Sequence, residues 1–244
     1  MLESLLWGAA ASAMLLAGAA IAYLFRPSPR LNAVVMAAGA GLLLGSVAYD
    51  LIEDALRSSS LLLVTVAFFL GSAAFLIGDL LLNRLGAAKR KDPSGGQTDG
   101  SALAIVMGSV LDGIPESFVL GLTVLQGGIS ISLFAGVALS NLPEGMASSS
   151  GLRIAGWSLA RVMRMWFVVI VVSAAFAAAG YVCFNPETGS LGPRHAGFAR
   201  AFAAGALLTM LADTMLPEAY EEEREFTGAL VVLGFAASLA LAAL

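Results

Sequence analysis

The sequence has few charged residues and almost no cysteine or histidine. Asp, Glu, Lys and Arg make up 12% of the 244 residues, against about 25% in a soluble domain. The one cysteine, Cys183, excludes an internal disulfide framework and a cysteine-rich metal site. The net charge of -4 argues against a nucleic-acid partner. Because 59% of the residues are hydrophobic, we expect most of the chain to lie in a lipid bilayer.

Eight stretches are apolar over about 20 residues, the length that crosses the hydrocarbon core of a bilayer. The first of them lacks a basic segment before it, which favours a retained span over a cleaved signal peptide. The pattern predicts an all-α integral membrane protein, with residues 1–244 in a single domain. The only long polar segment, about 83–100, is expected to be a flexible cytoplasmic loop. The eight stretches are 3–25, 31–52, 60–85, 101–124, 128–152, 159–183, 197–217 and 226–244.

The basic residues divide unequally between the two sets of loops that eight spans would create. Ten of the 13 Lys and Arg residues fall in the loops after the first, third, fifth and seventh spans. Since Lys and Arg collect on the cytoplasmic side, both termini are predicted to lie outside the cytoplasm, in a multi-pass protein of the cell membrane. The ten are Arg26, Arg30, Arg84, Lys89, Arg90, Lys91, Arg153, Arg161, Arg164 and Arg224, against Arg57, Arg194 and Arg200.

Two pairs of segments repeat within the chain. "AAGAGLLLGSVAYDLIEDA" at 37–55 resembles "AAGALLTMLADTMLPEA" at 203–219, and "DGIPES" at 112–117 resembles "SNLPEG" at 140–145. In the predicted topology the members of the first pair cross the membrane in opposite directions. Corresponding spans of opposite direction indicate an inverted repeat, and transporters place their sites at such repeat interfaces. We therefore expect a 3+2+3 arrangement of the eight spans.

The second pair places a proline inside each of two spans. Pro115 and Pro143 cannot donate a backbone hydrogen bond, and each ring crowds the carbonyl four residues earlier, at Leu111 and Leu139. In hydrocarbon a freed carbonyl is costly unless it faces protein, water or an ion. The two prolines therefore either free backbone carbonyls for a polar site within the membrane or are simple helix kinks.

Oxygen ligands accompany both prolines. Glu116 and Glu144 follow them directly, Asp112 and Ser140 lie one helical turn before the two glutamates, and Asn141 stands beside Ser140. If the two spans pack together, these side chains and the two loosened carbonyls can converge on one cluster. Three carboxylates at that depth must be protonated, hydrated or bound to a cation. An all-oxygen cluster suits a divalent cation.

With these motifs the chain resembles the ZIP family (Zrt-, Irt-like proteins) of divalent metal transporters, as a divergent bacterial-type member. The family signature in the fourth span is of the type His-Asn-x-Pro-Glu-Gly, with a similar one in the fifth. Here the two read Asp112 to Ser117 and Ser140 to Gly145. The resemblance implies eight helices, both termini outside, and metal uptake toward the cytoplasm through a site between the fourth and fifth spans.

The chain departs from the family at several positions. Asp112 and Ser140 replace the two histidines, Gly113 replaces the asparagine, and no acid stands near Ser173, where many members carry a glutamate. Zinc sites favour imidazole and thiolate, although carboxylates also serve, so an oxygen-only set shifts the expected ion from Zn²⁺ toward Mn²⁺, Mg²⁺ or Fe²⁺. A second metal in the site is not expected. The alternative is a transport-inactive ZIP-like membrane protein with a structural or sensing role.

Other acids leave alternatives open. Asp50 and Asp213 line the path to the site or are interface acids on hydrated helix ends, Asp79 has no evident partner, and His195 is expected to be a plain surface residue. The Tyr-Asp at position 50 suits an intramembrane aspartyl protease, but the segment 76–79 lacks the glycine such a protease needs. We therefore expect no enzyme and no cofactor. The expected partners are the transported ion, the bilayer and, as one option, a second copy in a homodimer.

Overall fold

The computed structural model describes residues 1–84, 101–125, 128–185, 191 and 193–243. The predicted loop at 83–100 therefore lies outside the described residues, apart from Asn83 and Arg84. Within the described ranges the regular structure is all helix, with no strand, as the sequence predicts. The helices are α1 (Leu2–Ser12), α2 (Met14–Leu24), α3 (Pro29–Ser46), η1 (Val47–Ile52), α4 (Glu53–Ser58), α5 (Leu61–Leu82), α6 (Ser101–Val124), α7 (Ile131–Ile154), α8 (Leu159–Phe184), α9 (Pro193–Met210), η3 (Leu211–Met215), α10 (Leu216–Glu223) and α11 (Thr227–Ala242).

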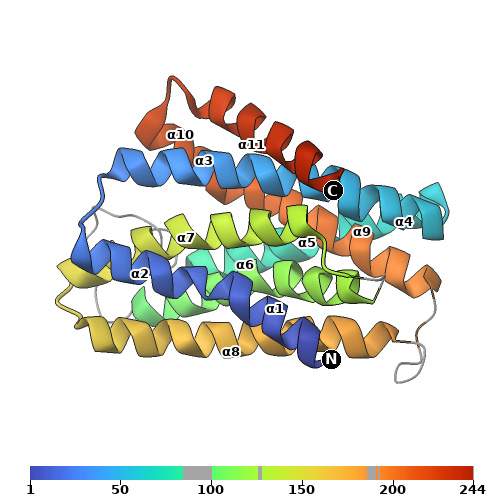
Figure 1. The fold of residues 1–244 in the computed structure, drawn as a ribbon, viewed down its shortest axis with the longest axis horizontal. Helices are drawn as coiled ribbons and strands as arrows, with labels where there is room; N and C mark the ends of the chain where they lie inside the picture. Colours follow the sequence, from blue (N-terminus) through green and yellow to red (C-terminus); the bar gives the residue numbers. More distant parts are fainter. Residues whose placement is uncertain (85–100, 126–127, 186–190, 192, 244) are drawn as a thin grey trace.

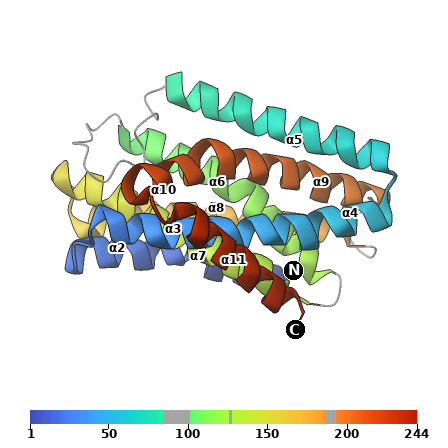
Figure 2. The ribbon, with the colours of Figure 1, turned by 90° about the horizontal axis from the view of Figure 1, so that it is seen from above.

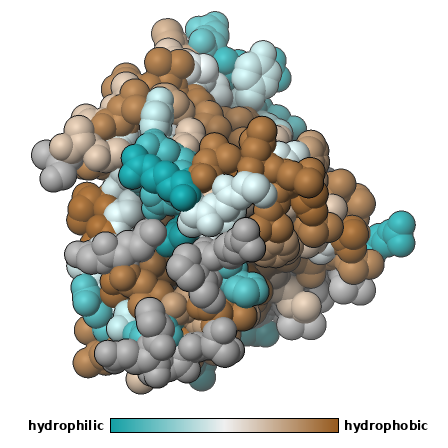
Figure 3. All heavy atoms as spheres, turned by 90° about the vertical axis from the view of Figure 1, so that its right-hand side faces the viewer, coloured by the Kyte–Doolittle hydropathy of each residue, from teal (hydrophilic) through white to brown (hydrophobic). Residues whose placement is uncertain are grey.

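These elements join end to end into eight rods that lie along one another in a bundle (Figure 1). Both chain ends lie toward the same end of the bundle, which we call the termini end. Figure 3 views that end and shows hydrophilic side chains among hydrophobic ones. In the view from above, α5 lies at one edge, with α9 and α6 further inside (Figure 2).

Serine side chains set the start of four rods. Each accepts a hydrogen bond from the backbone N–H three residues later, which satisfies one of the donors that a helix start leaves without a partner. The rods continue past the apolar runs: α4 ends at Ser58, not at the predicted 52, and α10 ends at Glu223, not at 217. The four caps are Ser28, Ser60, Ser130 and Ser158.

Six helices among the described residues are long and apolar enough to cross a membrane. This indicates a multi-pass membrane protein. The α7 rod is long enough but too polar to qualify, and α11 is apolar but short. The polarity of α7 has a physical cause, because most of this helix is buried against other helices and faces neither lipid nor water.

The rods pack in pairs through glycines that face the partner backbone. In α2 and α7, a Cβ at Gly18 would overlap the carbonyl oxygen of Leu142, and one at Gly145 would overlap that of Leu15. The same reciprocal contact recurs in three further pairs, so that in all four pairs each backbone lies against the other. Small residues allow such close approach where helices associate in lipid. The further pairs are α6 with α8 (Gly121, Gly180), α3 with α11 (Gly41, Gly234) and α5 with α9 (Gly71, Gly205).

Two rods contain a π-helical segment at corresponding places. The segment η1 begins six residues after Gly41, and η3 begins six residues after Gly205. Each π segment carries one aspartate, Asp50 or Asp213. The structure thus pairs Gly41 with Gly205. The opening Ala-Ala-Gly-Ala motifs of 37–55 and 203–219 would instead pair Gly39 with Gly205, so the structural alignment of the repeat differs by two residues. Single-turn π segments occur frequently at functional sites.

The glycine contacts generate a stability prediction. Gly234→Ala pushes a methyl group into the Ala38 carbonyl of α3, and such overpacking costs about 1–3 kcal/mol. Gly228 is the matched control, since it lies in the same helix with no atom within 4 Å of an added Cβ. Thermal unfolding of the purified protein should show Gly234→Ala destabilised and Gly228→Ala unchanged or slightly stabilised. Equal melting temperatures for the two variants would contradict the packing of α3 on α11.

Candidate ion-binding site

The proline motifs lie in α6 and α7, each inside its helix. All five predicted ligands are buried there, with exposed fractions between 2% and 7%. Burial at this level is unusual for carboxylates, which are almost never fully buried unless they are paired or bound. The five are Asp112, Glu116, Ser140, Asn141 and Glu144.

Two hydrogen bonds join α6 and α7 at the motifs. The Ser140 hydroxyl of α7 donates to Oε1 of Glu116 in α6 at 3.2 Å, and the Ser109 hydroxyl of α6 donates to Oε1 of Glu144 in α7. Each glutamate therefore accepts a hydrogen bond from a serine of the opposite helix. The order of the two pairs along the chain shows that the helices run antiparallel here. Ser140 also lies 2.9 Å from the carbonyl of Val137, so its single proton is shared between two acceptors.

Asn141 connects the motif to α1. Its side-chain Nδ2 donates to the backbone carbonyl of Ala11 at 3.3 Å. A carbonyl only accepts, so this bond fixes which way the amide is turned. The bond uses the amide nitrogen, so the amide oxygen is the atom of this side chain that a cation would use as a ligand.

Asp112 lies one turn before Glu116 and is 2% exposed. The residue after it, Gly113, faces α8, because a Cβ at this glycine would lie 3.1 Å from the hydroxyl of Ser173. Gly113 and Ser173 are two of the positions where the chain departs from the ZIP pattern, and the structure brings them together. A small residue at one position therefore faces a small residue at the other.

The three carboxylates do not form one compact group in this arrangement. Within the described ranges, no three Asp, Glu, His or Cys side chains lie together in a way that could hold a metal ion. The carbonyl that Pro143 frees lies close to α3. A Cβ at Gly39 of α3 would lie 3.1 Å from both the carbon and the oxygen of the Leu139 carbonyl, so this peptide unit packs against the Gly39 backbone.

Two acids outside the motifs, Asp50 and Asp79, have partners that the sequence did not reveal. Asp50 of η1 accepts hydrogen bonds from Ser130, at 2.9 Å, and from Ser132 at the start of α7. Asp79, for which the sequence offered no partner, accepts from the Asn83 side chain at 2.8 Å. Asp213 and His195 are exposed.

Sequence reasoning missed Ser109 as part of the site. A signal was present, because Ser109 stands seven residues before Glu116, which is two helical turns along the same face. Serine is common in membrane helices for packing reasons alone, so the spacing becomes informative only once α7 is known to lie opposite.

Comparison with known proteins gives no assignment of this site. No protein-family model matches the sequence, and no curated protein matches it with significance.

Proposed function

We propose that the protein is a divalent metal cation transporter that moves its ion toward the cytoplasm between α6 and α7. One observation supports this most: two buried glutamates, each beside a helix-interior proline, are bound crosswise by Ser109 and Ser140. Intramembrane acids are costly and commonly mark ion pathways. A purely structural contact between two helices does not need two carboxylates.

The donor atoms favour a hard cation. Glu116 and Glu144 supply carboxylates, Asn141 an amide oxygen and Ser140 a hydroxyl, with Asp112 one turn away on α6. Ions such as Mn²⁺, Mg²⁺ and Fe²⁺ accept such a set, and Zn²⁺ does so less readily without imidazole. To bind the ion, each glutamate must give up the hydrogen bond from its serine hydroxyl. The substrate thereby replaces hydrogen bonds that hold α6 to α7.

The packing supports eight crossings in a 3+2+3 inverted repeat. The α2–α7 pair corresponds to α8–α6, and the α3–α11 pair to α9–α5, with reciprocal glycines in all four. The polar helix α7 would be able to cross the membrane because neighbouring helices cover most of its surface. The 16 residues of α11 span about 24 Å at 1.5 Å per residue, close to the thickness of a thin hydrocarbon core. The basic loops then place both termini outside the cytoplasm, in the cell membrane.

The path of the ion follows from this orientation. Asp50 would lie on the outer side of the site, where Ser130 and Ser132 of α7 hold its carboxylate. Asp213 occupies the corresponding π segment of the other repeat and would lie toward the cytoplasm. In this scheme each aspartate provides a charge between the aqueous phase and the buried glutamates.

One observation favours the alternative, a transport-inactive ZIP-like protein with a structural or sensing role. The serine hydroxyls already supply each glutamate with a hydrogen bond, and no three acids are gathered. In that case the site would join two helices and do nothing more. Uptake of metal into proteoliposomes separates the two functions directly.

The uptake prediction ranks the site residues by charge. Across a panel of divalent ions, Glu116→Gln and Glu144→Gln should each abolish uptake, because ionised carboxylates dominate the attraction for a hard ion. Asp112→Asn should weaken uptake strongly, Asn141→Ala should be intermediate and Ser140→Ala mild. The measurement is the initial rate of ion entry into proteoliposomes of matched protein content.

A serine outside the site is the matched control for these variants. Ser46 is buried, donates to the Leu42 carbonyl of its own helix and lies close to Ser238 of α11, so Ser46→Ala should transport like the parent. Ser109→Ala should resemble Ser140→Ala, since the two serines make equivalent bonds. If the Glu116→Gln, Glu144→Gln double variant transports as well as the parent, the path lies elsewhere.

A binding prediction concerns stability in place of transport. The preferred divalent ion should raise the melting temperature of the parent, because a ligand that binds only the folded state stabilises it, by about 2.7 kcal/mol at one hundred times its dissociation constant. The double glutamine variant should show no such rise. Without metal it should be as stable as the parent or more stable, since two buried charges are gone. Equal metal stabilisation of both proteins would refute binding at the glutamates.

The orientation prediction uses single cysteines in a Cys183→Ser background. Arg57→Cys, at the termini end, should react with a membrane-impermeant maleimide in intact cells, and Glu225→Cys should react only after permeabilisation. Both native side chains are exposed, and the Arg57–Glu53 surface pair contributes only about 0–1 kcal/mol, so neither change should disturb the fold. The opposite labelling pattern would invert the proposed topology and the direction of transport.

A further inference from the structure

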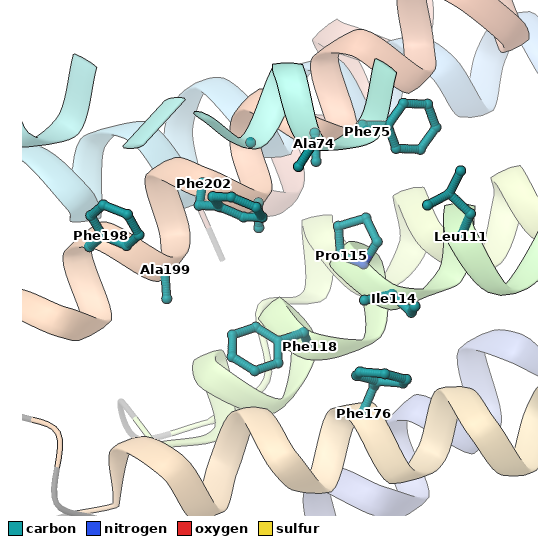
Figure 4. Close-up of a pocket in the computed structure, with 13 residues that line it drawn as sticks. Ala74, Phe75, Leu111, Ile114, Pro115, Phe118, Phe176, Phe198, Ala199 and Phe202 are labelled. Atoms are coloured by element: carbon teal, nitrogen blue, oxygen red, sulfur yellow. The ribbon is translucent and has the colours of Figure 1, made fainter. Parts of the chain in front are cut away.

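A cavity of about 520 Å³ lies between α5, α6, α8 and α9. This volume is within the range of small-molecule binding sites. Among the described residues its walls consist of apolar side chains and one glycine, and Figure 4 shows their arrangement around the space. The lining residues are Gly71, Ala74, Phe75, Leu111, Ile114, Pro115, Phe118, Phe176, Phe198, Ala199, Phe202, Ala203 and Ala206.

The cavity lies behind the proline motif of α6. Pro115 projects into it toward α9 (Figure 4), whereas its neighbour Glu116 is engaged by Ser140 of α7 on another face. The apolar side of α6 therefore borders the cavity, and the polar side borders the carboxylate site. Whatever occupies the cavity supports the helix at the turn that Pro115 loosens.

Water is an unfavourable content for this cavity, and leaving it empty forgoes packing contacts. An ordered water needs two to four polar partners, and every described residue that lines the walls has an apolar side chain or is glycine. An empty space of this size would leave the lining atoms without dispersion contacts on one side. The four helices around it all belong to the six that qualify as membrane spans, and Gly71, Ala74 and Phe75 lie midway along α5. In a bilayer this would put the cavity at the depth of the hydrocarbon core.

The contact between α3 and α7 shows how α9 and α6 would pack if the cavity between them were closed. In the proposed repeat, α3 and α7 correspond to α9 and α6. There Gly39 packs against the backbone of Leu139, which leaves little space between the helices. The corresponding residues are Ala203, two before Gly205, and Leu111, four before Pro115, and both line the cavity. The fold permits direct contact at this position, yet α6 and α9 stand apart.

We propose that the cavity binds an acyl chain of a bilayer phospholipid. The neighbouring surface faces lipid, since Phe69 and Ile77 of α5 are 67% and 58% exposed, and the cavity continues this surface inward. A hydrocarbon chain is the ligand present at that depth and matches walls without a polar anchor. The bound chain keeps α6 and α9 apart behind Pro115. This inference goes beyond the proposed function and does not rest on ion transport.

The experiment uses the full-length protein in phospholipid nanodiscs containing a phosphatidylcholine with a diazirine in its acyl chain. After irradiation, mass spectrometry of the digested protein locates the adducts. Phe118 and Phe176 are partly buried and line the cavity from α6 and α8, so adducts there report entry of the chain. We expect adducts at both, besides those on exposed residues such as Phe69.

Two neighbouring alanines of α5 provide a matched pair. Both are exposed, but Ala74 lines the cavity and Ala73 does not. Ala74→Leu should remove most of the labelling at Phe118 and Phe176, and Ala73→Leu should leave it unchanged. Ala199→Leu fills the cavity from α9 and should act like Ala74→Leu, which keeps the test valid if one variant fails to fold. Labelling that is confined to the outer surface of the parent, or that is unaffected by both filling variants, would overturn the proposal, as would a crosslinked dimer through these residues.

Discussion

The arrangement depends on backbone-to-backbone contact between helices, which eight glycines in four reciprocal pairs permit. In each pair a carbonyl oxygen occupies the space that a Cβ would need on the facing helix. Lipid provides little hydrophobic force between helices, so such close packing and interhelical hydrogen bonds must hold them together. These contacts seat α7 against α2 and α6 against α8. They thereby fix the two helices that carry the carboxylates, together with polar contacts such as that of Arg153 in α7 with the Ala22 carbonyl of α2.

Close packing also explains how polar residues are tolerated inside the bundle. Because neighbouring helices cover α7, its serines, asparagine and glutamate face protein, where hydrogen-bond partners are available. Each glutamate accepts from a serine across the interface, and Asn141 donates to a carbonyl of α1. Buried polar groups are costly only when they lack such partners. A lipid-exposed helix such as α5 correspondingly keeps its aspartate on a buried face, with Asn83 as its partner.

The helical class and the approximate rods were predictable, because hydrocarbon depth requires long apolar runs and serine caps mark their starts. The extra turns of α4 and α10 were not, since a helix that leaves the bilayer becomes polar without breaking. The burial of Glu116 and Glu144 followed from their apolar context. Their contacts with Ser140 and Ser109 depend on how α6 and α7 are set against each other. The packing of the Leu139 carbonyl depends in the same way on α3, and no local sequence pattern predicts either contact.

The two prolines have the same local effect but different surroundings, so α6 and α7 differ in how easily each helix can move. Pro143 is buried in α7, and the carbonyl it frees is packed against Gly39. Pro115 lies on the wall of the apolar cavity, a space that the described residues leave open between α6 and α9. A helix loosened at proline moves most easily toward the side that offers least packing resistance. Displacement of α6 toward α9 would draw Glu116 away from Ser140, and it requires the cavity to be vacated. If the proposed ion is held by both glutamates, its release and the contents of the cavity would therefore be coupled through the position of one helix.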